Sequence, residues 1–334
     1  MDDAKSDTIL SSTHPSTPPP PLHFAPAAAR LDAVSWISLL VLVAIWGSTY
    51  AVLRIGVRTI DPVWLVAGRL TGGALSMVVL MAVAQLFRRS GATSAYEPVG
   101  LVAIGWFSLV GVAFTAIPFV FYATAAKTTA SALLAICNGG TPIFTALVAH
   151  VVTRDDRLTP RRAAGVTIGF VGLFVLVAPE ILNGVTANAA GLAYAIIGAL
   201  LYAGSGICTR LAPRISPLAS TLVILTSGAI VALTCAALTT PFPVAPSIES
   251  LAAMVVLALV PTAFAYVLWV WLVQKAGAVF GSLTNYLMPL WAAGLGVVFL
   301  GENVSWPAFA AMALIVGGVA VASRRPRGAA QKFN

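Results

Sequence analysis

The sequence has very little charge. Aspartate, glutamate, lysine and arginine make up only 9% of its 334 residues, against about 25% in a typical soluble domain. Hydrophobic residues account for 59%, and the mean hydropathy is +0.94. So few charged side chains could not cover a water-facing surface of a protein this size. The composition therefore excludes an ordinary soluble protein and indicates one embedded in a lipid bilayer.

Cysteine is also scarce, and its placement excludes several kinds of site. Cys137, Cys208 and Cys235 each lie inside an apolar run, without a Cys-x-x-Cys pair or a histidine cluster. We interpret all three as buried free thiols and expect no metal or other cofactor. His-Glu-x-x-His, Gly-x-Ser-x-Gly and Walker A motifs are missing as well. The sequence thus predicts neither an enzyme nor an ATP-driven pump.

Acidic residues are absent from the long apolar runs. All eleven lie in tails, in loops or at the ends of runs. Carboxylates are the usual proton carriers of membrane pumps, so coupling through an acid inside the membrane is not favoured. The net charge of +8 raises the question of nucleic acid, but the basic residues form short clusters between apolar runs rather than a stripe. We therefore expect no nucleic-acid partner.

What the chain has instead is a series of apolar runs, each long enough to cross a bilayer as a helix of about 20 residues. We expect an all-α polytopic membrane protein with ten transmembrane helices. They lie at residues 34–53, 63–87, 99–125, 130–151, 163–179, 190–209, 217–239, 250–273, 278–300 and 306–322.

The basic residues between these runs predict the orientation. With a cytoplasmic N-terminus, the inside segments hold 15 lysines and arginines, and the outside loops hold only Arg54, Arg58 and Lys127. Cytoplasmic loops are enriched in these residues. We therefore expect both termini in the cytoplasm and the protein in the cytoplasmic, or inner, cell membrane.

Two parts of the chain share the same residues in the same order, 147 positions apart. The matched pairs are Thr115 and Thr262, Asn138 and Asn285, Pro142 and Pro289, Asp155 and Glu302, and Pro160 and Pro307. Proline and asparagine are unfavourable inside apolar helices, so their recurrence at one spacing indicates an internal duplication. Because each copy has five spans, the copies would enter the membrane in opposite senses, as inverted repeats.

This duplication divides the chain into four predicted parts. Residues 1–33 are rich in proline, serine and threonine and cannot bury enough apolar surface to fold, so we expect a disordered cytoplasmic tail. Residues 34–180 and 187–322 form the two five-helix repeats, and residues 323–334 form a basic cytoplasmic tail.

Several of these features resemble the EamA-type family of the drug/metabolite transporter superfamily. The similar motifs are Trp46-Gly47-Ser48, Asp61-Pro62 followed by Arg69, the prolines Pro142 and Pro289, and Gly301-Glu302. The resemblance covers about residues 34–322. It implies ten helices in two inverted five-helix repeats, a central cavity, and transport of small metabolites, often export of amino acids or foreign compounds. One departure is Arg154-Asp155, which stands where the family tends to have Gly-Glu.

Polar and aromatic side chains within the spans are candidate substrate contacts, because small-molecule sites are mostly apolar with a few orienting polar groups. The candidates are Trp46, Tyr50, Tyr122, Asn138, Thr141, Tyr202, Trp269 and Asn285. Pro142 and Pro289 are candidate hinges, since each removes a backbone donor. A structural interpretation stays open beside this one: the asparagines would tie down helix kinks or bond neighbouring helices, and the aromatic rings would fill the core.

Arg69 is the one charged residue placed within a span. At mid-membrane an arginine costs about 2.5–3.5 kcal/mol on insertion scales. Three roles are open for it: reaching back to the lipid headgroups, making a structural hydrogen bond, or contacting an anionic group of the substrate.

We therefore expect a secondary transporter, and an exporter, of small metabolites such as amino acids or drug-like compounds. It would work by alternating access around the central cavity. The alternative is an integral membrane scaffold or sensor that does not transport. The expected partners are a small-molecule substrate and the lipid bilayer. Gly68-x-x-x-Gly72 and Gly165-x-x-x-Gly169 predict close helix contacts, either within the chain or in a homodimer.

Overall fold

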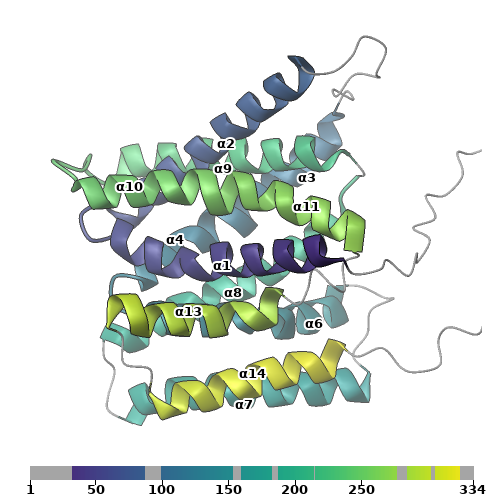
Figure 1. Ribbon diagram of the computed structural model, residues 1–334, viewed down its shortest axis with the longest axis vertical. Coiled ribbons are helices and arrows are strands. Elements are labelled where there is room, and N and C mark those ends of the chain that lie inside the picture. Colours follow the sequence, from purple (N-terminus) through teal and green to yellow (C-terminus); the bar gives the residue numbers. More distant parts are fainter. Residues whose placement is uncertain are drawn as a thin grey trace, which may run out of the picture. The chain divides into compact units, whose positions relative to one another are not determined.

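All regular elements in the described part of the chain are helices (Figure 1). The computed structural model describes residues 32–86, 99–152, 159–182, 187–213, 215–276, 284–301 and 305–323. The two predicted tails fall outside these ranges except at Asp32, Ala33 and Ser323, and the latter two are helical. The prediction of an all-α chain is confirmed for the residues described.

Seven stretches are long and apolar enough to cross a membrane, judged by length and composition. They are Ala33–Gly56, Pro62–Val83, Leu101–Ala125, Ser131–Val152, Asn188–Thr209, Leu218–Thr239 and Ile248–Trp269. Three shorter apolar helices are Ala163–Leu176, Leu287–Phe299 and Trp306–Val321. The chain is therefore a multi-pass membrane protein, and the predicted total of ten spans is not confirmed by length alone.

The helices follow the predicted runs closely. The first half contains α1 (Ala33–Gly56), α2 (Pro62–Leu86), α3 (Leu101–Gly111), η1 (Val112–Ala116), α4 (Ile117–Ala125), α5 (Ser131–Gly139), α6 (Thr141–Val152) and α7 (Pro160–Leu182). The second half contains α8 (Ala187–Leu211), α9 (Pro217–Thr239), α10 (Ile248–Leu257), η2 (Ala258–Phe264), α11 (Ala265–Ala276), α13 (Thr284–Leu300) and α14 (Trp306–Ser323). The segments η1 and η2 are π-helical.

Several helix starts follow directly from capping residues. Asp32 accepts a hydrogen bond from the backbone N–H of Ser35 at 2.9 Å and so caps α1. Ser216 and Ser247 cap α9 and α10 in the same way. Each cap satisfies one of the N–H groups that have no partner inside the helix.

Corresponding helices of the two halves pack against each other. Contacts join α2 with α9, α5 with α13, and α7 with α14, and Figure 1 shows α7 and α14 side by side. The first helix of each half also packs against helices of the other half. Helix α1 packs against α10, α11 and α13, and its counterpart α8 packs against α3, α4 and α5. The packing thus reproduces the two-fold relation that the sequence repeat suggests.

Helices α7 and α14 run antiparallel. Gly172 lies against Ile315, whereas Gly318, further along α14, lies against Gly165 and Gly169, which are earlier in α7. Added methyl groups on Gly318 would meet backbone atoms of the other helix. The glycine spacing predicted from the sequence is therefore a close contact within the chain.

Helices α2 and α9 also run antiparallel. Near the start of α2, the indole N–H of Trp64 donates to the carbonyl of Thr240 at 3.2 Å. Further along α2, Leu70 contacts Gly228, which lies earlier in α9. Two pairs of corresponding helices thus have the opposite directions expected of inverted copies.

Three loops predicted to share the outer face contact one another. The loop after α1 meets the loop after α9, where the N–H of Ser247 donates to the hydroxyl oxygen of Thr59 at 3.0 Å. It also meets the loop after α4, where Lys127 and Asp61 form an ion pair at 3.5 Å. These contacts agree with placing all three loops on one side of the membrane.

Large apolar side chains are exposed along several helices. Phe174 is 67% exposed, Ile230 is 60% exposed and Val298 is 73% exposed. Such exposure is costly in water but not in lipid. Cys235 is exposed as well, whereas Cys208 is partly buried and Cys137 is buried. Our prediction of three buried thiols was therefore wrong for Cys235, whose helix α9 turns that side chain outward.

Candidate functional site

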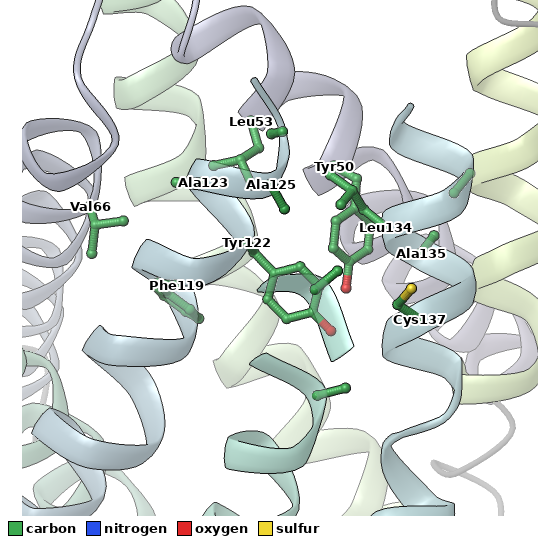
Figure 2. Packing of buried hydrophobic residues seen from close by; sticks show 14 of the residues in the cluster. Tyr50, Leu53, Val66, Phe119, Tyr122, Ala123, Ala125, Leu134, Ala135 and Cys137 are labelled. Carbon is green, nitrogen blue, oxygen red and sulfur yellow. The ribbon is translucent and has the colours of Figure 1, made fainter. Parts of the chain in front are cut away.

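Three tyrosines from different helices form a row inside the protein. Tyr50 of α1 and Tyr122 of α4 have ring centroids 5.7 Å apart, and Tyr122 is also 5.7 Å from Tyr202 of α8. Tyr50 is 7% exposed and Tyr122 is 3% exposed. Figure 2 shows the side chains of Tyr50 and Tyr122 turned toward the side of α5 that carries Cys137. Three of the predicted substrate contacts are therefore brought together.

Asn138 joins this row at the end of α5. Its side-chain oxygen accepts hydrogen bonds from the hydroxyl of Tyr122 at 3.3 Å and from Thr141 at 3.4 Å. These bonds tie the end of α5 to α4 and to the next turn. Asn138 and Thr141 thus lie beside the tyrosines, and Asn138 makes the kind of helix-to-helix bond that the structural interpretation requires.

The span that carries Asn138 is broken at its centre. Helix α5 ends at Gly139 and α6 begins at Thr141, while the N–H of Gly140 bonds to the carbonyl of Cys137 at 3.1 Å. Pro142 lies in the first turn of α6. A backbone N–H in the first turn has no partner inside its helix, so the missing N–H of proline costs nothing there. A break is thus found where the hinge was predicted.

In the second copy, the described residues show no break at the matching positions. Pro289 lies inside the continuous helix α13. The difference follows from the sequence, because Gly139 and Gly140 precede Pro142, whereas Tyr286 and Leu287 occupy the matching positions. Glycine lowers the cost of leaving the helix. Asn285 belongs to α13, but its side chain lies outside the described part of the structure, as do Asp155 and Glu302.

Arg69 is buried between the two halves. It is 7% exposed, its Nε donates to the hydroxyl oxygen of Thr262 at 3.0 Å, and its guanidinium carbon lies 3.9 Å from the centroid of the Phe119 ring. Phe119 in turn packs against Tyr202, with ring centroids 6.0 Å apart. The cation therefore points into the tyrosine group and does not reach back toward the lipid headgroups. A hydrogen bond and a cation–π contact offset part of its burial cost.

Thr262 belongs to a π-helical segment that occurs in both halves. In η2 its hydroxyl donates to the carbonyl of Leu257 at 2.8 Å. In η1 the hydroxyl of Thr115 donates to the carbonyl of Val110 at 3.0 Å. Each bond spans five residues, and the two bonds are 147 positions apart at both ends. The repeat found in the sequence is thus a repeat of local backbone geometry.

A proline removes one backbone donor from η2. Pro261 has no N–H, so it cannot donate to the carbonyl of Leu257 four residues back. The hydroxyl of Thr262 occupies that carbonyl instead. The carbonyl of Pro261 itself accepts from the indole N–H of Trp46 at 3.2 Å. The π-helical segment η2 therefore accepts hydrogen bonds from both Arg69 and Trp46.

Trp46 and Trp269 form a second aromatic group. Their ring centroids are 6.4 Å apart, and Trp46 is also 6.5 Å from Tyr266. Trp269 is 36% exposed, so it lies at the edge of the protein rather than in the tyrosine row. Trp46 and Tyr50 stand one turn apart on α1 and connect the two groups. The predicted substrate contacts are thus divided between two neighbouring groups.

A comparison with protein families matches this chain twice. The model of the EamA-like transporter family covers residues 34–178 and 189–324. The chain belongs to the EamA-like transporter family. It is therefore a transporter of the drug/metabolite transporter superfamily, as the first-span motif and the paired prolines suggested.

Other comparisons of this transporter concern the fold alone. No curated protein matches its sequence. One of several similar solved structures, described only as the crystal structure of a protein, is 22% identical and superposes with a TM-score of 0.59. The match covers 87% of this chain and 97% of the other. The whole length of that relative is thus represented in the transporter.

Three residues around Arg69 and Trp46 were missed by the sequence reasoning: Phe119, Tyr266 and Pro261. Phe119 and Tyr266 are 147 positions apart, so they form another matched pair of the repeat. Phe119 stacks on Arg69, and Tyr266 packs against Trp46. Thr262 was noticed only as part of the repeat, and Pro261 was not noticed. Comparing aromatic residues at the same spacing of 147 positions would have found Phe119 and Tyr266.

Proposed function

We propose that this transporter is a secondary exporter of small metabolites such as amino acids or drug-like compounds. It binds them at the tyrosine row and Arg69, and it works by alternating access. The observation that carries this proposal is the position of Arg69. This cation of the first half is buried and donates a hydrogen bond to Thr262 in the π-helical segment η2 of the second half. A charge inside a membrane protein is rare and generally serves a substrate or ion path.

The chemistry around Arg69 suits a small molecule with an anionic group. Only Nε of its guanidinium makes a hydrogen bond to a described residue, which leaves Nη1 and Nη2 as donors for a carboxylate. The rings of Tyr50, Tyr122 and Tyr202 supply an apolar wall with hydroxyls as orienting groups. An amino acid or another carboxylate with an apolar side chain fits this combination.

The two inverted copies provide a basis for alternating access, in which the site opens first to one side of the membrane and then to the other. We propose ten spans arranged as inverted repeats at residues 34–180 and 187–322, with both termini in the cytoplasm. The antiparallel pairs α2 with α9 and α7 with α14 support this arrangement. Gly140 and Pro142 form a hinge in the first copy, and Pro289 forms its counterpart in the second.

Flux through purified protein tests the proposal. Vesicles containing the full chain should release preloaded labelled amino acids faster than empty vesicles. Asn138→Ala and Asn285→Ala should lower the flux while expression and the unfolding temperature are kept. Loss of folded protein would instead favour the structural role of the asparagines. If no amino acid or drug-like compound crosses faster than in empty vesicles, the scaffold or sensor alternative takes precedence.

Export is tested separately in cells. A strain that expresses the transporter should tolerate toxic amino-acid analogues at higher concentration and should accumulate less of them. Arg69→Ala should remove this resistance. Greater sensitivity than the strain without the transporter would show uptake and would contradict the proposed direction.

A further inference from the structure

The three cations predicted on the outer face meet in one pocket. Arg54, Arg58 and Lys127, together with Val57 and Ala126, line a cavity of about 370 Å³. We call this the basic pocket. Arg54 lies in the last turn of α1, Arg58 lies in the turn that follows, and Lys127 lies in the turn after α4. Residues 70 positions apart in the sequence are therefore gathered around one space.

Among the described residues, the three cations of the pocket lie near two carboxylates. Asp61 pairs with Lys127 at 3.5 Å, and Glu249 lies within coulombic range of Arg58. Neither carboxylate lines the cavity, whose charged lining consists of the three cations. Concave sites lined by charge of one sign focus the field and attract the opposite charge.

We propose that the basic pocket binds a phosphate-bearing anion, for which the headgroup of an anionic phospholipid is the source the position favours. The pocket lies beside the end of the candidate membrane span Ala33–Gly56, and the end of a span is where lipid phosphates are expected. The guanidinium groups of Arg54 and Arg58 present the planar pair of donors that binds phosphate oxygens side by side. Val57 and Ala126 add an apolar floor beside the charges. This inference does not depend on the proposed export activity.

A simpler role for the cations is to stabilise the C-terminal ends of α1 and α4 through the helix dipole. That role predicts a loss of stability when the charges are removed, but no dependence on lipid phosphate. The two roles are therefore separated by measuring binding and stability on the same variants.

The test uses the purified full chain in uncharged detergent micelles. It is titrated with dioleoyl phosphatidylglycerol, dioleoyl phosphatidylcholine or inorganic phosphate, and binding is followed by the shift of the thermal unfolding midpoint. Phosphatidylglycerol should raise the midpoint more than phosphatidylcholine. Its affinity should fall about tenfold for each arginine changed to glutamine, and it should weaken as salt rises from about 50 to 300 mM.

The outcomes distinguish the sources of phosphate. Binding of phosphatidylglycerol that is lost in Arg54→Gln/Arg58→Gln/Lys127→Gln and resists inorganic phosphate supports the lipid. Binding of inorganic phosphate that the triple variant loses supports the free anion. The inference is overturned if neither ligand binds, if the triple variant binds like the wild type, or if Arg161→Gln, an exposed cation of α7, weakens binding equally.

A second variant guards against misfolding of the first. Arg54→Lys/Arg58→Lys keeps both charges but removes the planar donors. It should bind phosphatidylglycerol several-fold more weakly than the wild type while unfolding at the same temperature without lipid. Unchanged affinity in this variant would overturn the assignment of the two arginines.

Discussion

At the scale of single residues, Arg69 is the buried side chain that most needs polar or aromatic neighbours to replace its water. A guanidinium is costly to bury unless polar or aromatic groups replace its water. Thr262 and the face of Phe119 do so from two different helices, one in each half. Because the bond to Thr262 crosses between the halves, Arg69 joins the first half to the second, and in the proposed function its remaining donors bind the substrate.

Replacing Arg69 by lysine should separate its charge from its shape. The ammonium group of Arg69→Lys lacks both the planar face over Phe119 and the Nε donor to Thr262. We expect export to fall at least about tenfold, which corresponds to about 1.4 kcal/mol. The flux assay in vesicles measures this effect, and Arg161→Lys on the exposed start of α7 is the matched control. Wild-type flux in Arg69→Lys would show that the charge alone is sufficient.

At the scale of helices, the two π-helical segments share one side-chain hydrogen bond but differ in their bonds to the other half. Thr115 and Thr262 each satisfy a carbonyl five residues back. Thr262 also accepts from Arg69, which has no charged counterpart in the second half, where Ser216 stands 147 positions later. The second segment is therefore joined to the first half by a side-chain hydrogen bond that has no counterpart at Thr115 among the described residues.

Thr115→Val and Thr262→Val test this difference. Valine matches the shape of threonine but removes the hydroxyl, so each change removes one buried hydrogen bond to a backbone carbonyl, at about 0.5–1.5 kcal/mol. Thr262→Val also removes the acceptor of Arg69 and should destabilise more than Thr115→Val. Thermal unfolding in detergent measures both. Equal losses would show that the bond to Arg69 contributes nothing to stability.

Two neighbouring glycines of α14 provide a matched pair of variants. A Cβ atom at Gly318 would lie 2.5 Å from the carbonyl oxygen of Gly165 and 2.7 Å from the nitrogen of Gly169, whereas a Cβ at Gly317 meets nothing within 4 Å. Gly318→Ala should therefore destabilise the protein by about 1–3 kcal/mol. Gly317→Ala should be neutral or stabilising by up to about 1 kcal/mol. Similar unfolding temperatures for both variants would contradict the close contact of α7 with α14.

The sequence was informative about elements and much less so about their contacts. Apolar runs predicted the helices because lipid and backbone hydrogen bonding constrain each run independently. The break near Pro142 was predictable, but its absence at Pro289 depends on the preceding residues, Gly139 and Gly140 in one copy and larger side chains in the other. The partner of Arg69 was not predictable, because Thr262 lies 193 positions away and one sequence does not say which helices face each other.

At the scale of the whole molecule, the loops after α1, α4 and α9 contact one another and so share one face. The charge distribution assigns that face to the outside, because the inside segments hold 15 of the lysines and arginines and these loops hold three. The proposed orientation therefore depends on charge, while the grouping of the loops depends on contacts in the structure.

Reporter fusions test the orientation. Reporters placed after Arg89, Arg162 and Arg214 should be active in the cytoplasm, and one placed near Glu302 should be active outside, since short basic loops stay on the cytoplasmic side. Alkaline phosphatase and a fluorescent protein read the two sides. The reversed pattern would leave the helix packing intact but would invert the proposed direction of the protein in the membrane.

The unequal helices α5–α6 and α13 have an energetic consequence for the transport cycle. In a transporter made of identical inverted halves, exchanging their conformations would give two states of equal free energy, one open to each side. Here the span of the first half is broken at Gly139 and Gly140, whereas the matching positions of the second half lie inside helix α13, together with Pro289. The empty transporter should therefore populate one state over the other, and each 1.4 kcal/mol of difference changes that ratio about tenfold. Under the proposed alternating access, the protein without a ligand should therefore have a preferred resting side.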